Sequence, residues 1–267
     1  MKLLEGKRIA ITGGTEGIGL SLVESLLQQG ASIAACGLQD PDPEVLDAFS
    51  ATSDLHFFKA DLSQPDQAIS FVQDAFSALG GLDHLINNAG TFQDIDFLDI
   101  APSHFHKTFD LNVAGYFFCA QEFVRLVGPR HQDASILCMG STNSIQAEEG
   151  GVLYDASKGA ILMLVRSMAV ELAKRGIRVN GIGPGIIETS LTAPGLAPDG
   201  VREFIEHQTP QGRVGRPRDI CGTAVYLCSS MAEYVTGQMI YVDGGIVAQQ
   251  MKRTPCPQQK KIKETHV

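Results

Sequence analysis

The chain has no tryptophan, few aromatic residues (7%) and no long run of apolar residues. No stretch approaches the roughly 18 uncharged apolar residues that a membrane-spanning helix needs, so we expect no membrane partner. Residues 1–14 carry charges within their only apolar stretch, which is not the pattern of a secretory signal peptide. These absences predict a cytoplasmic protein.

Basic residues are outnumbered, and the formal net charge is −9. The tail 251–267 runs against this balance, because it holds five Lys or Arg residues and one Glu, which leaves the body at −13. Such an acidic body predicts no nucleic-acid partner. The tail is polar and contains proline, so we expect it to be flexible, with a docking arm as the alternative.

The six cysteines form no CxxC pair and no spacing typical of a disulfide framework. Cys36, Cys119 and Cys138 lie in apolar runs and are expected to be core thiols. His104 and His106 are close together, but no acid or cysteine follows them at ligand spacing. The sequence therefore predicts no metal site.

Short apolar runs alternate with longer segments of helical period. Expected strands cover 7–13, 31–36, 55–60, 82–88, 134–140, 177–183 and 238–245, and expected helices cover 17–29, 66–79, 103–127, 152–175 and 217–229. The strand runs are almost continuously apolar, which is typical of strands buried on both faces. Strand–helix alternation predicts an α/β fold with a doubly wound, seven-stranded parallel sheet, in a single domain over 1–250. The patternless segment 186–212 is predicted to be a substrate loop.

Glycines gather where the first expected strand passes into the first expected helix, in TGGTEGIG (12–19). Gly13 permits a sharp turn, Gly17 lets the backbone approach a pyrophosphate, and Gly19 allows close packing of helix and strand. The helix N-terminus offers free N–H groups and a partial positive charge to phosphates. Asp61, after the third strand, could accept from an adenine amino group, and the small residues of NNAG (87–90) would let the chain pass close to a cofactor. The pattern indicates a dinucleotide-binding site.

Tyr154 and Lys158 lie four residues apart in an expected helix and therefore share one face. Such a pair is ordinarily a solvated surface pair, and an acid–base catalyst is the alternative. The other motifs decide between them, because together they resemble the short-chain dehydrogenase/reductase family over about residues 5–247. In the family's order they are Thr12-Gly-x-x-x-Gly-Ile-Gly19, Asn87-Asn-Ala-Gly90, Asn112, Ser141, Tyr154-x-x-x-Lys158 and Pro184-Gly185. Ser141 precedes Tyr154 by the family's usual spacing.

The resemblance implies a Rossmann-like fold, an NAD(P)-dependent hydride transfer and four catalytic residues. Tyr154 would be the general acid–base, with a pKa near 10 that Lys158 and the nicotinamide bring toward working pH. Ser141 would hold the substrate oxygen, Lys158 would also bind the nicotinamide ribose, and Asn112 would hold a water for a proton relay. The implied cofactor-binding residues are Gly13, Thr15, Glu16, Gly17, Ile18, Gly19, Gly37, Leu38, Asp61, Leu62, Asn88, Ala89, Gly90, Tyr154, Lys158, Pro184, Gly185, Ile187 and Thr189. The last two fall where the family holds the carboxamide.

The end of the second expected strand departs from the family pattern. Gly37 stands where NAD-preferring relatives carry an acid, and Leu38 where NADP-preferring relatives carry Arg. Glu16 stands where some NADP-preferring relatives carry a base, and its carboxylate would repel a 2′-phosphate. We therefore predict NAD(H) over NADP(H), and Asp40 could reach the ribose if its loop folds back.

The expected substrate pocket is walled by 92–97, 143–153 and 186–212, by analogy with the family. Its apolar residues favour a medium or large hydrophobic secondary alcohol or ketone, although half of them could be ordinary core or subunit contacts. They are Phe92, Ile145, Val152, Leu153, Ile186, Leu191, Leu196 and Phe204. Glu148 and Glu149 would disfavour acidic substrates if they face the cleft, and a solvated pair is the alternative.

Two other functions compete with this reading. One is an NADPH-dependent 3-oxoacyl or polyketide ketoreductase, which the non-basic Val170 before Glu171 disfavours. The other is a non-catalytic dinucleotide sensor, which the four filled catalytic positions disfavour. The segments 103–127 and 152–175 are apolar on more than one face, so we expect a homotetramer.

Overall fold

Seven parallel strands form one sheet in the order β3-β2-β1-β4-β5-β6-β7 in the computed structural model, which describes residues 2–49, 52, 54–128 and 133–250. The strands are β1 (Arg8–Thr12), β2 (Ser32–Gly37), β3 (Leu55–Lys59), β4 (His84–Asn87), β5 (Ser135–Met139), β6 (Arg178–Pro184) and β7 (Met239–Val242). Strand order reverses between β1 and β4, which creates a crevice at the carboxyl ends of the strands. The predicted doubly wound, seven-stranded single domain is confirmed.

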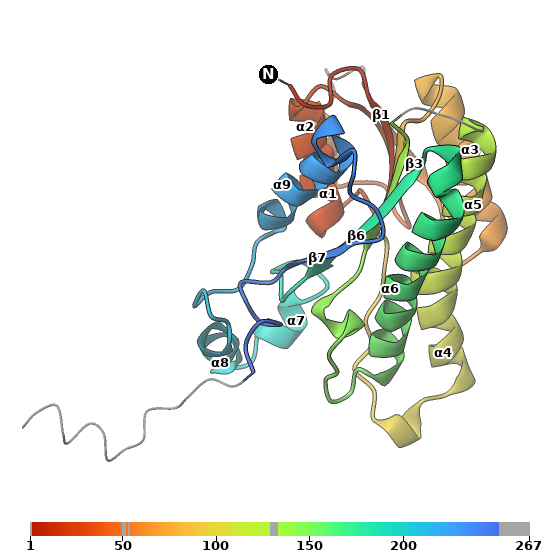
Figure 1. Ribbon diagram of the computed structural model, residues 1–267. Helices are drawn as coiled ribbons and strands as arrows, with labels where there is room; N and C mark the ends of the chain where they lie inside the picture. Colours follow the sequence, from red (N-terminus) through yellow and green to blue (C-terminus); the bar gives the residue numbers. More distant parts are fainter. Residues whose placement is uncertain (1, 50–51, 53, 129–132, 251–267) are drawn as a thin grey trace, which may run out of the picture.

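Helices cover both faces of the sheet (Figure 1). On one face pack α1 (Gly17–Gln28) and α9 (Pro217–Cys228), and on the other α3 (Pro65–Leu79), α5 (Tyr116–Val127) and α6 (Val152–Leu172). Successive strand residues alternate between the two cores, as the pleat requires: Ile9 and Ile11 face α1, whereas Ala10 faces α3. Both faces are buried, which explains the continuous apolar runs of the sequence.

The remaining helices are short. They are α2 (Pro43–Phe49), α4 (Pro102–Phe109), α7 (Ala193–Leu196), α8 (Val201–Gln208), the π-helical turn η2 (Asp110–Gly115) and the 3-10 turns η1 (Phe97–Asp99), η3 (Thr142–Ser144), η4 (Ala173–Arg175) and η5 (Ser230–Ala232). The expected helical segment 103–127 is confirmed, because α4, η2 and α5 follow one another without a gap, and η2 is a π-helical turn between the two α-helices. The segment 186–212 holds α7 and α8, and its role as a substrate loop stays a prediction. The predicted flexible tail, 251–267, lies outside the described residues.

Within the described residues, no helix combines the length and the apolar character needed to span a membrane. The same part of the chain contains no group of three or more His, Cys, Asp or Glu arranged for a metal ion. Cys36, Cys119 and Cys138 are buried free thiols, which confirms their predicted place in the core.

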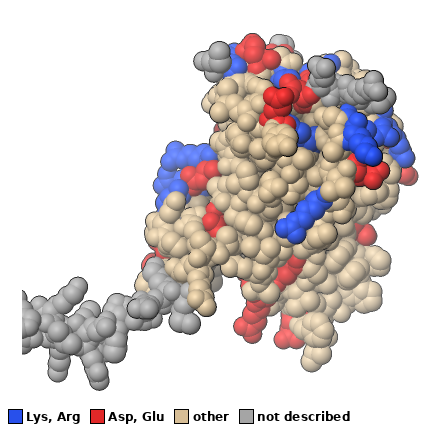
Figure 2. Space-filling model, in the orientation of Figure 1, with Lys and Arg blue, Asp and Glu red and all other residues tan. Residues whose placement is uncertain are grey.

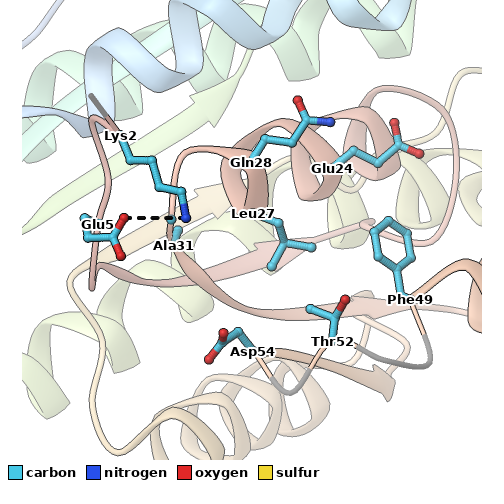
Figure 3. A pocket seen from close by; sticks show the side chains of 10 residues that line it. Lys2, Glu5, Glu24, Leu27, Gln28, Ala31, Phe49, Thr52 and Asp54 are labelled. Carbon is cyan, nitrogen blue, oxygen red and sulfur yellow. Dashed lines mark ion pairs between the residues drawn. The ribbon is translucent and has the colours of Figure 1, made fainter.

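A hollow of about 630 Å³ lies at the amino edge of β2 and β3. Glu24 and Gln28 of α1, Phe49 of α2 and Asp54 line it, and Lys2 pairs with Glu5 at its rim (Figure 3). In open parallel sheets, ligands bind in a crevice at the carboxyl ends of the strands, which is the opposite edge of this sheet. The size of this hollow therefore does not locate the active site.

Candidate active site

The glycine-rich turn between β1 and α1 is built so tightly that side chains are excluded from it. Gly13 and Gly17 have φ angles of 64° and 54°, in the left-handed region that favours glycine. A Cβ on Gly13 would lie 2.8 Å from the Ala89 Cα, and one on Gly19 would lie 1.8 Å from the Gly13 carbonyl oxygen. The first N–H groups of α1 have no intrahelical acceptor and favour an anion. The turn therefore fits the pyrophosphate of a dinucleotide.

Thr12 and Asn88 hold this turn against the end of β4. The Asn88 amide nitrogen Nδ2 donates to the carbonyl oxygens of Thr12 and Gly13, at 3.1 and 2.9 Å. The Thr12 Oγ1 accepts from the backbone N–H groups of Asn88 and Ala89, at 2.8 and 3.1 Å. The side chain of Asn88 thus supports the turn. Thr12 was absent from the expected site residues, although it begins the glycine motif.

At Gly37, where NAD-preferring members of the resembled family carry an acid, the end of β2 has no room for a side chain. A Cβ on Gly37 would lie 2.3 Å from Oγ1 and 2.6 Å from Cγ2 of Thr15, so the Thr15 side chain fills this space. Leu38 next to it is 64% exposed. The Glu16 carboxylate accepts a hydrogen bond from Ser190 Oγ at 2.5 Å, which ties the glycine turn to the segment 186–212.

Two expected cofactor residues turn their side chains into the core. Leu62 and Ile187 are only 5% and 4% exposed, so a ligand can meet only their backbone. Asp61 Oδ1 accepts from both the N–H and the hydroxyl of Ser63, at 3.0 and 2.7 Å. Thr189 does lie beside the glycine turn, because a Cβ on Gly17 would come within 3.4 Å of its methyl group.

The four expected catalytic residues meet at the carboxyl edge of β4 and β5. Lys158 is buried, so the surface-pair alternative for Tyr154 and Lys158 is wrong. The Lys158 Nζ lies 5.5 Å from the centroid of the Tyr154 ring and donates to the Met139 carbonyl oxygen at 2.9 Å. Ser141, which caps η3, hydrogen-bonds the Tyr154 side chain. The Phe92 ring packs edge-on against Tyr154, with 5.2 Å between centroids.

Burial dominates the electrostatics of the Tyr154–Lys158 pair. It raises the pKa of Tyr154 to about 12, which the hydrogen bond from Ser141 opposes and the charges of Glu148 and Asp155 reinforce. Burial also lowers the pKa of Lys158 to about 8. The expected lowering of the Tyr154 pKa is therefore not a property of the protein alone, because desolvation of the phenol acts in the opposite direction.

Asn112 lies in the π-helical turn η2 and is completely buried. Its Nδ2 donates to the Thr91 carbonyl oxygen (3.0 Å) and to Ser157 Oγ (3.1 Å), and its Oδ1 accepts from the Thr91 N–H (2.8 Å). These bonds fix the backbone that follows β4. π-turns are frequent at functional sites, and the role of Asn112 in holding a water stays a prediction.

Gly90 leaves the space beside the Lys158 ammonium open. A Cβ there would lie 3.3 Å from Asn112 Oδ1 and 3.7 Å from Lys158 Nζ. A longer side chain at this position would cover both groups. Together with the glycine turn at α1, this open space fits an extended dinucleotide lying across the strand ends.

Ser157 and Asn143 belong to the site but were not singled out from the sequence. Ser157 Oγ donates to the Tyr154 carbonyl oxygen at 2.7 Å while it accepts from Asn112, so it joins η2 to α6. A serine that bonds back three residues along a helix is a recognisable pattern. Its position directly before Lys158 was the available signal.

Comparison with known proteins gives the same assignment. The family model described as enoyl-(acyl carrier protein) reductase matches residues 13–247. The chain is 34% identical over 253 residues to an L-rhamnose 1-dehydrogenase (NAD(P)(+)) of Sphingomonas sp. (strain SKA58), covering 92% of this chain and 98% of that protein. It is 34% identical over 246 residues to a 3alpha-hydroxysteroid dehydrogenase of Mediterraneibacter gnavus, covering 91% of this chain and 97% of the other.

A similar solved structure is a gluconate 5-dehydrogenase from Burkholderia cenocepacia J2315, in complex with NADP and tartrate. It is 29% identical, with a TM-score of 0.83, over 92% of this chain and 97% of that one. Sequence, fold and site geometry agree along nearly the whole chain. The protein therefore belongs to the short-chain dehydrogenase/reductase family, as an NAD(P)-dependent oxidoreductase acting on secondary alcohols.

Proposed function

We propose that Tyr154 is the general acid–base that interconverts a secondary alcohol and its ketone, with Ser141 and Lys158 as its partners. The observation that carries this proposal is the buried meeting of Tyr154, Ser141 and Lys158 at the carboxyl edge of the sheet. A nicotinamide cofactor, when bound, supplies or accepts the hydride. Glycine-rich backbone at 13–19 would hold its pyrophosphate, and Lys158 its ribose.

The burial of Tyr154 and Lys158 gives each side chain a distinct role in the proton transfer. Ser141 and Tyr154 together donate hydrogen bonds to the substrate oxygen, and Tyr154 gives it a proton in reduction or takes one in oxidation. A phenolate at Tyr154 is costly in this buried place, as its raised pKa shows. The Lys158 ammonium stabilises that phenolate through the same low-dielectric surroundings, which strengthen attraction between opposite charges.

Replacement Tyr154→Phe tests the proposal. Loss of a general acid–base costs about 10²–10⁴-fold in kcat, whereas the ring and its packing against Phe92 are kept. NADH fluorescence titration checks that cofactor binding survives, and Tyr234→Phe, at a fully exposed tyrosine, is the matched control. A Tyr154→Phe protein with more than a tenth of wild-type turnover would contradict the assignment.

NAD(H) is the proposed cofactor in preference to NADP(H). The support is electrostatic, since Glu16 places a carboxylate at the N-terminus of α1 and the neighbouring Leu38 offers no charge to a 2′-phosphate. NADH is expected to bind wild-type protein more tightly than NADPH, and Glu16→Arg is expected to reduce that difference. Tighter NADPH binding by the wild type, measured by the same titration, would overturn this preference.

A hydrophobic substrate and a homotetramer complete the proposal. Ile145, Val152, Leu191 and Phe204 are exposed, as pocket-lining residues would be, whereas Leu153 and Leu196 belong to the core. Helices α4, α5 and α6 expose Phe105, Phe117, Met163 and Val170, which supports subunit contacts through these helices. Light scattering at micromolar concentration is expected to give a tetramer mass, and a monomer mass would refute it. A cytoplasmic location stays a prediction.

A further inference from the structure

Asn143 connects the catalytic serine to two carboxylates. Its backbone N–H donates to Ser141 Oγ at 3.1 Å, and its Oδ1 accepts from the same hydroxyl at 3.4 Å. Its Nδ2 donates to Asp155 Oδ1 at 2.6 Å and to Glu148 Oε1 at 3.0 Å. A fixed hydrogen-bond path therefore runs from the catalytic Ser141 to the Glu148 side chain.

Glu148 is held by its backbone as well as by its side chain. Asp155, in the first turn of α6, accepts from the Glu148 N–H at 3.1 Å through its second oxygen. Its neighbour Glu149, which is exposed as Glu148 is, makes no such contact among the residues that the structure describes. Both glutamates reach solvent, but only Glu148 is anchored, by its hydrogen bonds with Asn143 and Asp155.

Glu148 stands in an acidic surrounding. Partial burial raises the pKa of its carboxyl group, and the charges of Asp155 and Asp94 raise it further, against the hydrogen bond from Asn143. The Asp94 carboxylate lies directly over Gly150, because a Cβ there would come within 2.0 Å of its Oδ1. The charges of Glu148 and Asp155 also act on the Tyr154 hydroxyl, whose pKa they raise. The charges of Glu148 and Asp155 therefore act at the place where Tyr154 would hold the substrate oxygen.

Cations that could offset this field are engaged elsewhere. Between Ile186 and Gly215 the chain has two Lys or Arg residues: Arg202 pairs with Glu188, and Arg213 pairs with Asp219. On the face shown in Figure 2, acidic side chains gather at the lower end, and no basic ones are seen there. A substrate carboxylate needs a free Arg or Lys as its partner. No Arg or Lys is among the described groups that act on the Glu148 carboxyl, and Lys158 donates to the Met139 carbonyl oxygen.

We propose that Glu148 sets the substrate class of this site. Its carboxylate accepts a hydrogen bond from a second hydroxyl next to the reacting carbon of a neutral alcohol, and it rejects an alcohol with a carboxylate at that place. An ionised carboxylate only accepts hydrogen bonds, so it favours a hydroxyl and repels another carboxylate. This inference rests on the proposed function, because it takes Tyr154 and Ser141 as the groups that hold the reacting oxygen.

Binding measurements without turnover test the inference directly. Two probes share one ring, cyclohexane-1,2-diol and 2-hydroxycyclohexanecarboxylate, and calorimetry measures their dissociation constants in the presence of saturating NAD⁺. All proteins carry Tyr154→Phe to block turnover, alone or combined with Glu148→Gln or, as the matched control, Glu149→Gln. The diol is expected to bind at least about tenfold more tightly than the hydroxy acid to the Tyr154→Phe protein.

Glu148→Gln is expected to bring the two dissociation constants to within about threefold of each other, because it keeps the shape and removes the charge. Glu149→Gln is expected to leave the ratio unchanged. Three results would each overturn the inference: equal binding of both probes before the Glu148 change, a ratio that Glu148→Gln leaves intact, or no binding of the diol. The proposed function fails separately, when Tyr154→Phe retains turnover.

Discussion

The two edges of the sheet treat buried charge in opposite ways. At the amino edge, the Arg8 guanidinium donates two hydrogen bonds of 2.9 and 3.0 Å to the Asp83 carboxylate. The Arg8 backbone N–H donates a third to it at 2.9 Å. Burial alone would raise the pKa of Asp83, but the bonds and charge of Arg8 outweigh it and lower that pKa. At the carboxyl edge, no acid pairs with Lys158 among the described residues, and burial lowers its pKa to about 8.

This difference separates a structural use of charge from a chemical one. A charge paired with an opposite charge holds strands together and resists change in its protonation state. A charge that burial disfavours is easily discharged or neutralised, which is the property a proton-transfer site needs. The amino edge should therefore govern stability, and the carboxyl edge should govern turnover.

Lys158→Met gives the largest expected effect and acts only on turnover. Removing the ammonium removes the group that stabilises the Tyr154 phenolate, so kcat is expected to fall about 10²–10⁴-fold. Stability should not fall, because a buried charge is replaced by an apolar side chain of similar length at the cost of one hydrogen bond to Met139. Steady-state kinetics and urea unfolding measure the two effects. A large loss of stability would break the comparison.

Asp83→Asn should give the reverse result. It leaves the Arg8 guanidinium without its charged partner, and the free energy of unfolding is expected to fall by about 2 kcal/mol. kcat should change less than twofold, since Asp83 lies at the opposite edge of the sheet from Tyr154. Asp74→Asn, at an exposed acid of α3, is the control for loss of a charge. If Asp83→Asn and Asp74→Asn lowered the free energy of unfolding equally, the Arg8–Asp83 pair would add no stability.

The pH dependence of stability should reveal Lys158 more subtly. Its folded pKa of about 8 lies below the ordinary value of 10.5, so the unfolded chain binds more protons between these two pH values. For this group alone, stability is lowest below pH 8 and rises as the pH increases toward 10.5. Urea unfolding at several pH values should therefore show a more positive slope for wild type than for Lys158→Met. Identical slopes would mean that the pKa of Lys158 is not lowered in the folded protein.

The sequence predicted the sheet and the pairing of Tyr154 with Lys158 because both depend on local and periodic signals. Apolar runs and helix periods located all seven strands, and the spacing of Tyr154 and Lys158 placed them on one face of α6. The π-helical turn η2 was not predicted, and its Asn112 bonds to Thr91 and Ser157, which are distant in sequence.

The short helices α7 and α8 and the difference between Glu148 and Glu149 also escaped prediction. α8 is eight residues long and has no side-chain cap, and helices this short are marginal without tertiary packing. Glu148 and Glu149 look identical in the sequence, and the bonds that Glu148 makes with Asn143 and Asp155 separate them. The burial that raises the Tyr154 pKa in the protein alone could not be read from a motif.

The buried thiols can report separately on the opening of the two core layers, one on each side of the sheet. Cys119 and Cys138 belong to the layer under α3, α5 and α6, whereas Cys228 lies in the layer under α1 and α9. Burial raises the pKa of each of these three thiols to about 12, so none is a reactive thiolate at neutral pH while its layer stays closed. The rate at which an alkylating reagent reaches each cysteine therefore times the opening of its own layer, and would show which side of the sheet comes apart first.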